Sequence, residues 1–244
     1  MIYGWILLAG AALAVAFGLR SSSGAAAPSV GPWLPAKKEG RTLNDALLSA
    51  VLELLPTAST VLRPGDAALD PVYGGRRADA FGAPAWGYYQ RKIASGSGGT
   101  TCGTVLAYWM GRAGWPLDMI DRAPTDPVAP GASFTPGLSV SKIIDGAKRR
   151  GWYQAGGMSW QPGDAYHVDH PPRVNSDHVG AVVSVSAPRA DGTRIIETGD
   201  GGQGDGADVK RNLRTLSADG STLTLDGVPA RVLGTLRATP QAIA

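Results

Sequence analysis

Three residues of the chain have the types and the order needed for nucleophilic catalysis: Cys102, His178 and Glu197. Cys102 is the single cysteine, and it follows a flexible run from Ser95 to Thr101 at the point where a helix is expected to begin. The N-terminus of a helix favours an anion, so a thiol placed there ionises more readily to the nucleophilic thiolate. The alternative interpretation of a lone cysteine is a small buried apolar side chain.

His178 and Glu197 belong to neighbouring predicted strands. His178 opens a run of alternating apolar residues, and Glu197 lies near the end of the following strand, beyond the turn Ala190-Asp191-Gly192. In an antiparallel hairpin an acid at this place can lie beside the histidine, orient its imidazole and stabilise the imidazolium. Each residue alone is more typical of a surface or structural position, but together they predict a Cys-His-acid site.

The order of these residues and of two accompanying motifs resembles a known family. The carriers are Cys102, Pro162-Gly163-Asp164, Asp177-His178-Val179-Gly180 and Ile196-Glu197. They resemble the CHAP and NlpC-type cysteine peptidases and amidases over about residues 95–236. The resemblance implies a papain-like fold and hydrolysis of amide bonds in bacterial peptidoglycan, with Cys102 as nucleophile, His178 as general base and Glu197 as the orienting residue.

The sequence departs from that family pattern in two places. The CHAP pattern often has an Asn shortly after the acid, whereas Gly199 and Asp200 occupy this region, so Asp200 is the alternative third residue. Before the cysteine, Thr101 replaces the familiar Asp or Gln, which leaves the subfamily open. Trp109 and Trp160 are the candidate substrate-binding residues, since indole rings can stack on sugars; filling the core is the alternative.

Hydrophobic periodicity places these residues on helices that precede strands. Helices are expected from Thr42 to Pro56, from Cys102 to Met110 and from Ser139 to Arg150. Strands are expected over 165–168, 178–185, 194–198, 223–225 and 231–236, and the glycine-rich stretch 199–208 is expected to form a loop beside the site. The predicted fold class is α+β: a papain-like fold with a cysteine-bearing helix packed on a mainly antiparallel β-sheet, preceded by an N-terminal transmembrane helix.

The N-terminal segment predicts a membrane anchor. Residues 2–19 carry no charge and are just long enough, as a helix, to cross a hydrocarbon core of roughly 30 Å. A cleaved signal peptide and a buried helix are the alternatives. The predicted organisation is an anchor or signal over 1–20, a flexible linker over 21–40, a helical and loop-rich extension over 41–94 and a cysteine amidohydrolase or peptidase domain over 95–240.

Composition excludes several other classes of protein. With 43% hydrophobic residues the chain can form a real core, and with a net charge of only +3 nucleic acid is not an expected partner. One cysteine excludes an internal disulfide and a cysteine-based zinc cluster. Three histidines, His167, His170 and His178, are candidate zinc ligands, but His167 and His170 alternate across a predicted strand and need not face one ion, so no metal or other cofactor is expected.

These patterns predict a membrane-tethered cysteine hydrolase that cleaves amide bonds in peptidoglycan, as an endopeptidase or amidase. The alternatives are a protease or acyltransferase with a non-wall substrate, and an anchored binding module without catalytic activity. The predicted localisation is a single-pass N-terminal anchor with the catalytic domain facing the cell envelope or outside. Basic residues after the span, Arg20, Lys37, Lys38 and Arg41, argue for the opposite orientation, and a phage or prophage origin would also account for a wall-degrading domain.

Overall fold

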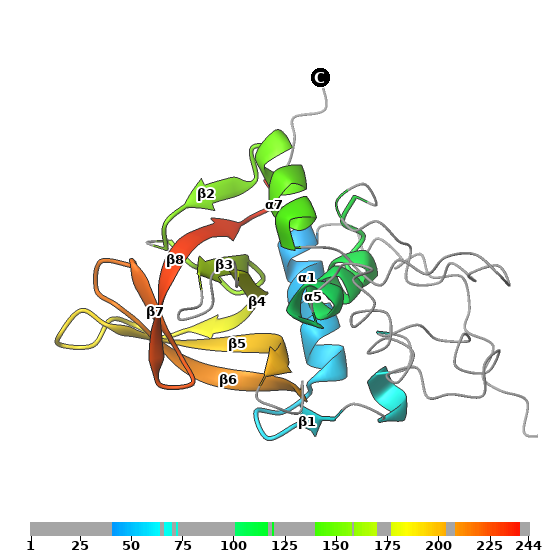
Figure 1. Ribbon diagram of the computed structural model, residues 1–244, viewed down its shortest axis with the longest axis horizontal. Coiled ribbons are helices and arrows are strands. Elements are labelled where there is room, and N and C mark those ends of the chain that lie inside the picture. The colour runs from blue at the N-terminus through cyan, green and yellow to red at the C-terminus, as the bar shows by residue number, and fades with distance from the viewer. Residues whose placement is uncertain are drawn as a thin grey trace, which may run out of the picture. The chain divides into compact units, whose positions relative to one another are not determined.

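The central element of the fold is a ring of antiparallel strands, seen in a computed structural model of the chain (Figure 1). The structure describes residues 41–63, 66–69, 72, 101–116, 119, 140–157, 159–169, 177–203 and 208–239, all of which belong to the compact unit Trp33–Ala244. Strand pairing follows the order β6-β5-β4-β3-β8, and β7 pairs with both β6 and β8, which closes six strands into a barrel. β1 and β2 extend the sheet beside β6 and β8. The strands are β1 (Val61–Leu62), β2 (Tyr153–Ala155), β3 (Ala165–Asp169), β4 (Asp177–Val185), β5 (Arg194–Gln203), β6 (Asp208–Leu216), β7 (Thr222–Leu225) and β8 (Val228–Leu236).

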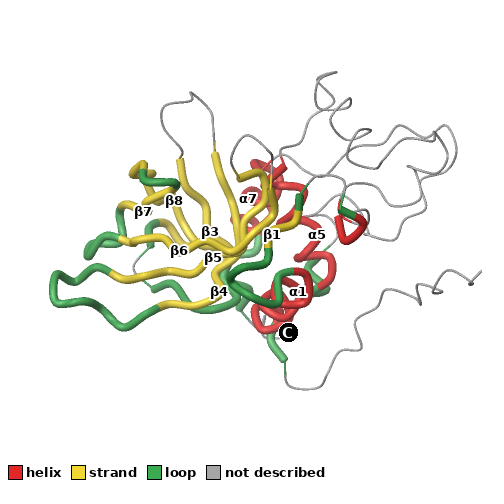
Figure 2. The backbone as a smooth tube through the Cα atoms, turned by 90° about the horizontal axis from the view of Figure 1, so that it is seen from below, coloured by secondary structure: helices red, strands yellow, loops and turns green. Residues whose placement is uncertain are grey.

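Three α-helices of the described ranges gather on one side of the barrel (Figure 1 and Figure 2). They are α1 (Leu43–Leu54), α5 (Thr101–Arg112) and α7 (Val140–Arg149), and a short 3-10 helix covers Ala67–Leu69. The α1 helix begins at the capping box that Thr42 and Asp45 form, as its sequence predicts. It packs against α5 and β4, and α5 packs against β4 and β5.

Alternation along the strands divides the apolar residues between two cores. One face of β4, with Val179, Ala181 and Val183, packs with the three helices. The opposite face of β3, β4 and β5, with Tyr166, Val182 and Ile196, packs inside the barrel. Because side chains of successive strand residues point to opposite faces, residues 178, 180 and 182 of β4 share the inner face.

This architecture corrects the predicted fold class. The helices and most strands occur where the sequence predicts them, but the strands form a closed six-stranded barrel with two extra strands, so a papain-like α+β fold is not shown. The decisive element is the short strand β7, because its pairing with β6 and β8 joins what would otherwise be the edges of an open sheet. Strand signals in a sequence do not specify which strands pair, so the closure was not predictable from them.

The predicted localisation is corrected as well. In the part of the chain that the structure describes, no helix has the length and apolar character that membrane crossing requires. The three α-helices have 12, 12 and 10 residues, whereas a span needs about 20. The single-pass anchor is therefore not shown; the segment 2–19 and the linker 21–40 on which it was predicted lie outside the described residues.

Candidate active site

Cys102 lies in the first turn of α5. This helix packs closely on β5, the strand that carries both candidate acids. Cys102 is 9% exposed. The thiol is a hydrogen-bond partner of His178, which opens β4 and is 8% exposed. The predicted nucleophile and general base are thus brought together from two elements that are far apart in the chain.

Glycines allow this close approach of helix and strand. A methyl group at Gly201 would lie 2.5 Å from Val105 of α5, and one at Gly202 would lie 2.9 Å from Cβ of Thr101. Both distances are shorter than real Cβ contacts, so larger residues would push α5 away from β5. The first half of the stretch predicted as a loop, residues 199–203, is part of β5, which continues to Gln203, and its glycines set the position of the cysteine helix.

Asp200 is the acid that lies beside His178. Its Oδ1 is 3.3 Å from His178 Nε2, and the two residues come from adjacent positions of the β4–β5 pair, where Gly180 faces Asp200. Tyr166 of β3 joins them: its hydroxyl donates to Asp200 Oδ1 and accepts from His178 Nε2 at 3.1 Å. Nε2 is thus the ring nitrogen that interacts with both Asp200 and Tyr166.

Glu197 lies on the other face of the same strand. Ile196, Thr198 and Asp200 share one phase of the strand alternation, and Glu197 has the opposite phase. Its carboxylate is 2.7 Å from Arg211 Nη2 and accepts a hydrogen bond from Ser184 at 3.3 Å. The structure therefore brings Cys102, His178 and Asp200 together, and does not bring Glu197 to them.

The Asp200 carboxylate is fully buried and holds a dense set of donors. Besides Tyr166 and His178 on Oδ1, its Oδ2 accepts from the side chains of three residues of β5 and β6, which are Thr198 at 2.6 Å, Asn212 at 2.7 Å and Arg214 at 2.9 Å. Burial alone would raise the pKa of Asp200, but the positive charge of Arg214 and the hydrogen bond from His178 hold it well below its ordinary value. Asp200 is consequently ionised throughout the physiological range.

His178 keeps its proton to unusually high pH. Burial would lower the pKa of His178, but hydrogen bonds with Asp200 and Cys102 and the negative charges of both raise it from 6.5 to about 9. An imidazolium beside a thiol stabilises the thiolate. At neutral pH this geometry favours a thiolate–imidazolium pair, the reactive form of a cysteine nucleophile.

The two predicted substrate-binding tryptophans are buried. Trp109 has no exposed surface and lies within α5, and Trp160 is 5% exposed and stacks on Tyr166 with 5.5 Å between ring centroids. Both are packed in the two cores. Their role toward a substrate stays a prediction.

The side chain of His167 interacts with residues outside the candidate site. Its Nδ1 is 3.2 Å from the Tyr153 hydroxyl, and its Nε2 is 3.2 Å from Asp177 Oδ2. Burial lowers the pKa of His167, partly opposed by Asp177. Within the described ranges, no group of three or more potential ligands is placed to hold a metal ion, and His170 lies outside these ranges.

The Pro162-Gly163-Asp164 motif fixes elements around the site. Asp164 is fully buried, accepts from Asn44 of α1 at 3.0 Å and forms an ion pair with Arg237 at 2.6 Å. Asp164 therefore connects α1 and the segment after β8 to the start of β3.

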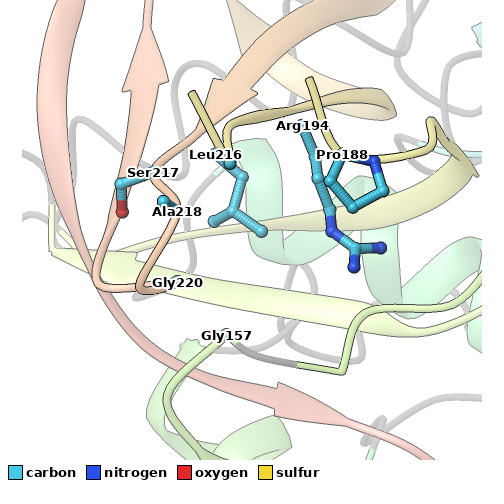
Figure 3. A pocket seen from close by; sticks show the side chains of 8 residues that line it. Gly157, Pro188, Arg194, Leu216, Ser217, Ala218 and Gly220 are labelled. Atoms are coloured by element: carbon cyan, nitrogen blue, oxygen red, sulfur yellow. The ribbon is translucent and has the colours of Figure 1, made fainter. Parts of the chain in front are cut away.

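A surface pocket lies elsewhere in the barrel and is lined by Arg194, Leu216 and Gly220 among others (Figure 3). None of Cys102, His178 and Asp200 lines this pocket.

Sequence reasoning missed four members of the site: Tyr166, Thr198, Asn212 and Arg214. Thr198 could have been found from the strand alternation, because it continues the phase of the apolar Ile196. Asn212 and Arg214 lie in β6, which was not expected to be a strand because its sequence, Asp208 to Leu216, is largely polar.

Comparison with known proteins identified no relative of the chain. No family model matches it, and the searches of curated proteins and of solved structures found no match either.

Proposed function

We propose that the chain is a cysteine amidohydrolase or peptidase that uses Cys102 as nucleophile, His178 as acid and base, and Asp200 as the orienting acid. The observation that carries the proposal is the hydrogen bond of a helix N-terminal thiol with a buried histidine whose Nε2 lies 3.3 Å from a buried carboxylate. An inert structural cysteine needs none of these partners.

The chemistry follows from the positions of the protons. The Cys102 thiolate attacks the carbonyl carbon of an amide, and the imidazolium of His178 then protonates the leaving amine. Water, deprotonated by His178, attacks the thioester and releases the acid and the thiol. Backbone N–H groups in the first turn of α5 are suited to stabilise the oxyanion of each tetrahedral intermediate.

Asp200 keeps His178 in the productive orientation. Because Asp200 and Tyr166 both engage Nε2, the orientation of the ring is fixed. The negative carboxylate also stabilises the imidazolium during the attack.

Peptidoglycan is the proposed substrate class. This part rests on the resemblance of Cys102, the Pro162-Gly163-Asp164 turn and the Asp177-His178-Val179-Gly180 strand to the CHAP and NlpC-type enzymes. Peptide and amide bonds of the bacterial wall are the bonds that these families cleave, and the proposed nucleophile is suited to them.

The test compares the purified full-length chain with Cys102→Ala, His178→Ala, Asp200→Asn and Glu197→Gln on purified peptidoglycan, with mass spectrometry of the released fragments. We expect no hydrolysis by Cys102→Ala and a rate lower by about 10²–10⁴-fold for His178→Ala. Glu197→Gln is the matched control for Asp200→Asn, since it neutralises an acid on the opposite face of the same strand, and it should retain the wild-type rate within a few-fold.

Labelling of Cys102 by iodoacetamide separates the outcomes. Fragment release that survives in Cys102→Ala would refute the mechanism. His178-dependent labelling without release of wall fragments would refute peptidoglycan as substrate and leave another amide. A thiol whose labelling does not depend on His178 would refute the enzyme and favour a binding module.

A further inference from the structure

The two oxygens of the Asp200 carboxylate have separate partners. Oδ1 interacts with His178 and Tyr166, whereas Oδ2 accepts from Thr198, Asn212 and Arg214. Oδ1 thus interacts with the residues of the candidate site, and Oδ2 is fixed by donors from β5 and β6. Rotation of the carboxylate would break hydrogen bonds on both sides at once.

Arg214 is the positively charged residue among the three that donate hydrogen bonds to Oδ2. Its side chain is 1% exposed and lies within the barrel, on the β6 position that pairs with Ile196 of β5. Nη2 is 2.9 Å from Asp200 Oδ2, and Nε donates to the Thr198 hydroxyl at 3.0 Å. Since Thr198 in turn donates to Oδ2, the guanidinium holds the carboxylate both directly and through this hydroxyl.

A buried guanidinium is costly unless an opposite charge compensates it. Asp200 supplies this charge, and the dependence is mutual, because a carboxylate buried without a cation tends to take up a proton. A protonated Asp200 would lose the negative charge that stabilises the His178 imidazolium.

We propose that Arg214 is a positioning residue that acts through Asp200: it keeps the carboxylate ionised and turned so that Oδ1 is available to His178. The inference rests on the proposed function, because it gives Arg214 a part in the reactivity of Cys102. It extends the site to a residue of β6 whose guanidinium contacts the Asp200 carboxylate.

The experiment measures the rate of Cys102 alkylation by iodoacetamide between pH 4 and pH 10 in the folded full-length chain, without substrate. The variants are Arg214→Met, which removes the charge, and Arg214→Lys, which keeps it. Arg211→Met is the matched control, since it removes an arginine of the same strand that pairs with Glu197 on the opposite face.

In the wild type and in Arg211→Met, Asp200 stays ionised and does not limit the rate at acid pH. In Arg214→Met, we expect the low-pH limb of the profile to move upward by about 2 pH units or more, because the cation that opposes the effect of burial on the pKa of Asp200 is lost and only His178 and the neutral donors still lower this pKa. Arg214→Lys should restore most of the wild-type profile. A purely structural role would lower the yield of folded protein and leave the profile of the folded fraction unchanged.

If Arg214→Met does not fold, a second variant tests the same proposal. Thr198→Val removes the hydroxyl that links Nε of Arg214 to Oδ2 of Asp200, and a smaller upward movement of the same limb is expected. A His178-dependent profile that neither substitution moves overturns the role of Arg214 alone. A wild-type profile that does not depend on His178 overturns the proposed function itself.

Discussion

Substitution of Gly180 by alanine tests the geometry of the site with a single methyl group. Gly180 faces Asp200 across the β4–β5 pair, on the inner face of the barrel. The added methyl would lie 2.5 Å from Asp200 Oδ1, 2.7 Å from a ring carbon of Tyr166 and 2.8 Å from the carbonyl oxygen of Gly199. Its φ is not among the positive values of the chain, so alanine meets a steric obstacle and no backbone strain.

The size of the effect follows from these distances. An ordinary contact is 3.4 Å or longer, so the carboxylate must retreat by about 0.9 Å. The bond between His178 Nε2 and Oδ1 is already 3.3 Å long, which leaves little room for that movement. Loss of a hydrogen bond to a charged group costs about 1.5–3 kcal/mol, so the pKa of His178 should fall by about 1 to 2 from its value near 9.

The assay is an NMR titration of the histidine ring signals, which is tractable because the chain has three histidines. Thermal unfolding measures the accompanying overpacking cost of about 1–3 kcal/mol. Gly234→Ala is the control: its methyl would lie 2.5 Å from the Tyr153 ring and 2.6 Å from a backbone oxygen, equally crowded but away from the carboxylate. If Gly180→Ala is destabilised like the control and His178 still titrates near 9, the proposed coupling is refuted.

Three further predictions concern charge. The free energy of unfolding should decrease as pH rises from 6.5 to 9, because His178 binds its proton more tightly when folded; urea titrations in which His178→Ala shows the same slope would contradict this. Cys102→Ala should lower the pKa of His178 measured by NMR, because a hydrogen-bond partner and its negative charge are lost. Asp164→Asn should cost about 3 kcal/mol in urea unfolding, because it leaves the partly buried Arg237 unpaired, and Asp169→Asn, in an exposed ion pair, less than about 1 kcal/mol; equal losses would argue against the Asp164 contacts.

The sequence was informative wherever one periodicity dominated. The alternation after His178 predicted β4, and the apolar spacing of Val105, Leu106, Trp109 and Met110 predicted the buried face of α5. It failed for β6, where alternation is inverted: Leu213 is 73% exposed, whereas Arg214 is buried in the barrel. The sequence of a strand with polar residues on its inner face resembles that of a surface loop. It can be identified as a strand only when the buried carboxylate that these residues bind is known.

The third residue of the site could be narrowed but not chosen from the sequence. Glu197 and Asp200 belong to the same strand, β5, and only the phase relative to His178 separates them. That phase depends on the irregularity of the β4–β5 pair between Val182 and Ser184, which shifts the register. No local pattern announces such a bulge, because it results from the pairing of two strands.

The contact between α5 and the barrel has a consequence for the newly made chain. Cys102 comes from a helix, and the histidine and carboxylate come from strands that follow much later in the sequence, so the groups meet only when helix and barrel have docked. Until then the thiol has the reactivity of an ordinary cysteine, and mostly carries its proton at neutral pH. Under the proposed mechanism, a chain still being synthesised, or a misfolded one, does not expose an activated nucleophile, and the reactivity of Cys102 would report completed folding.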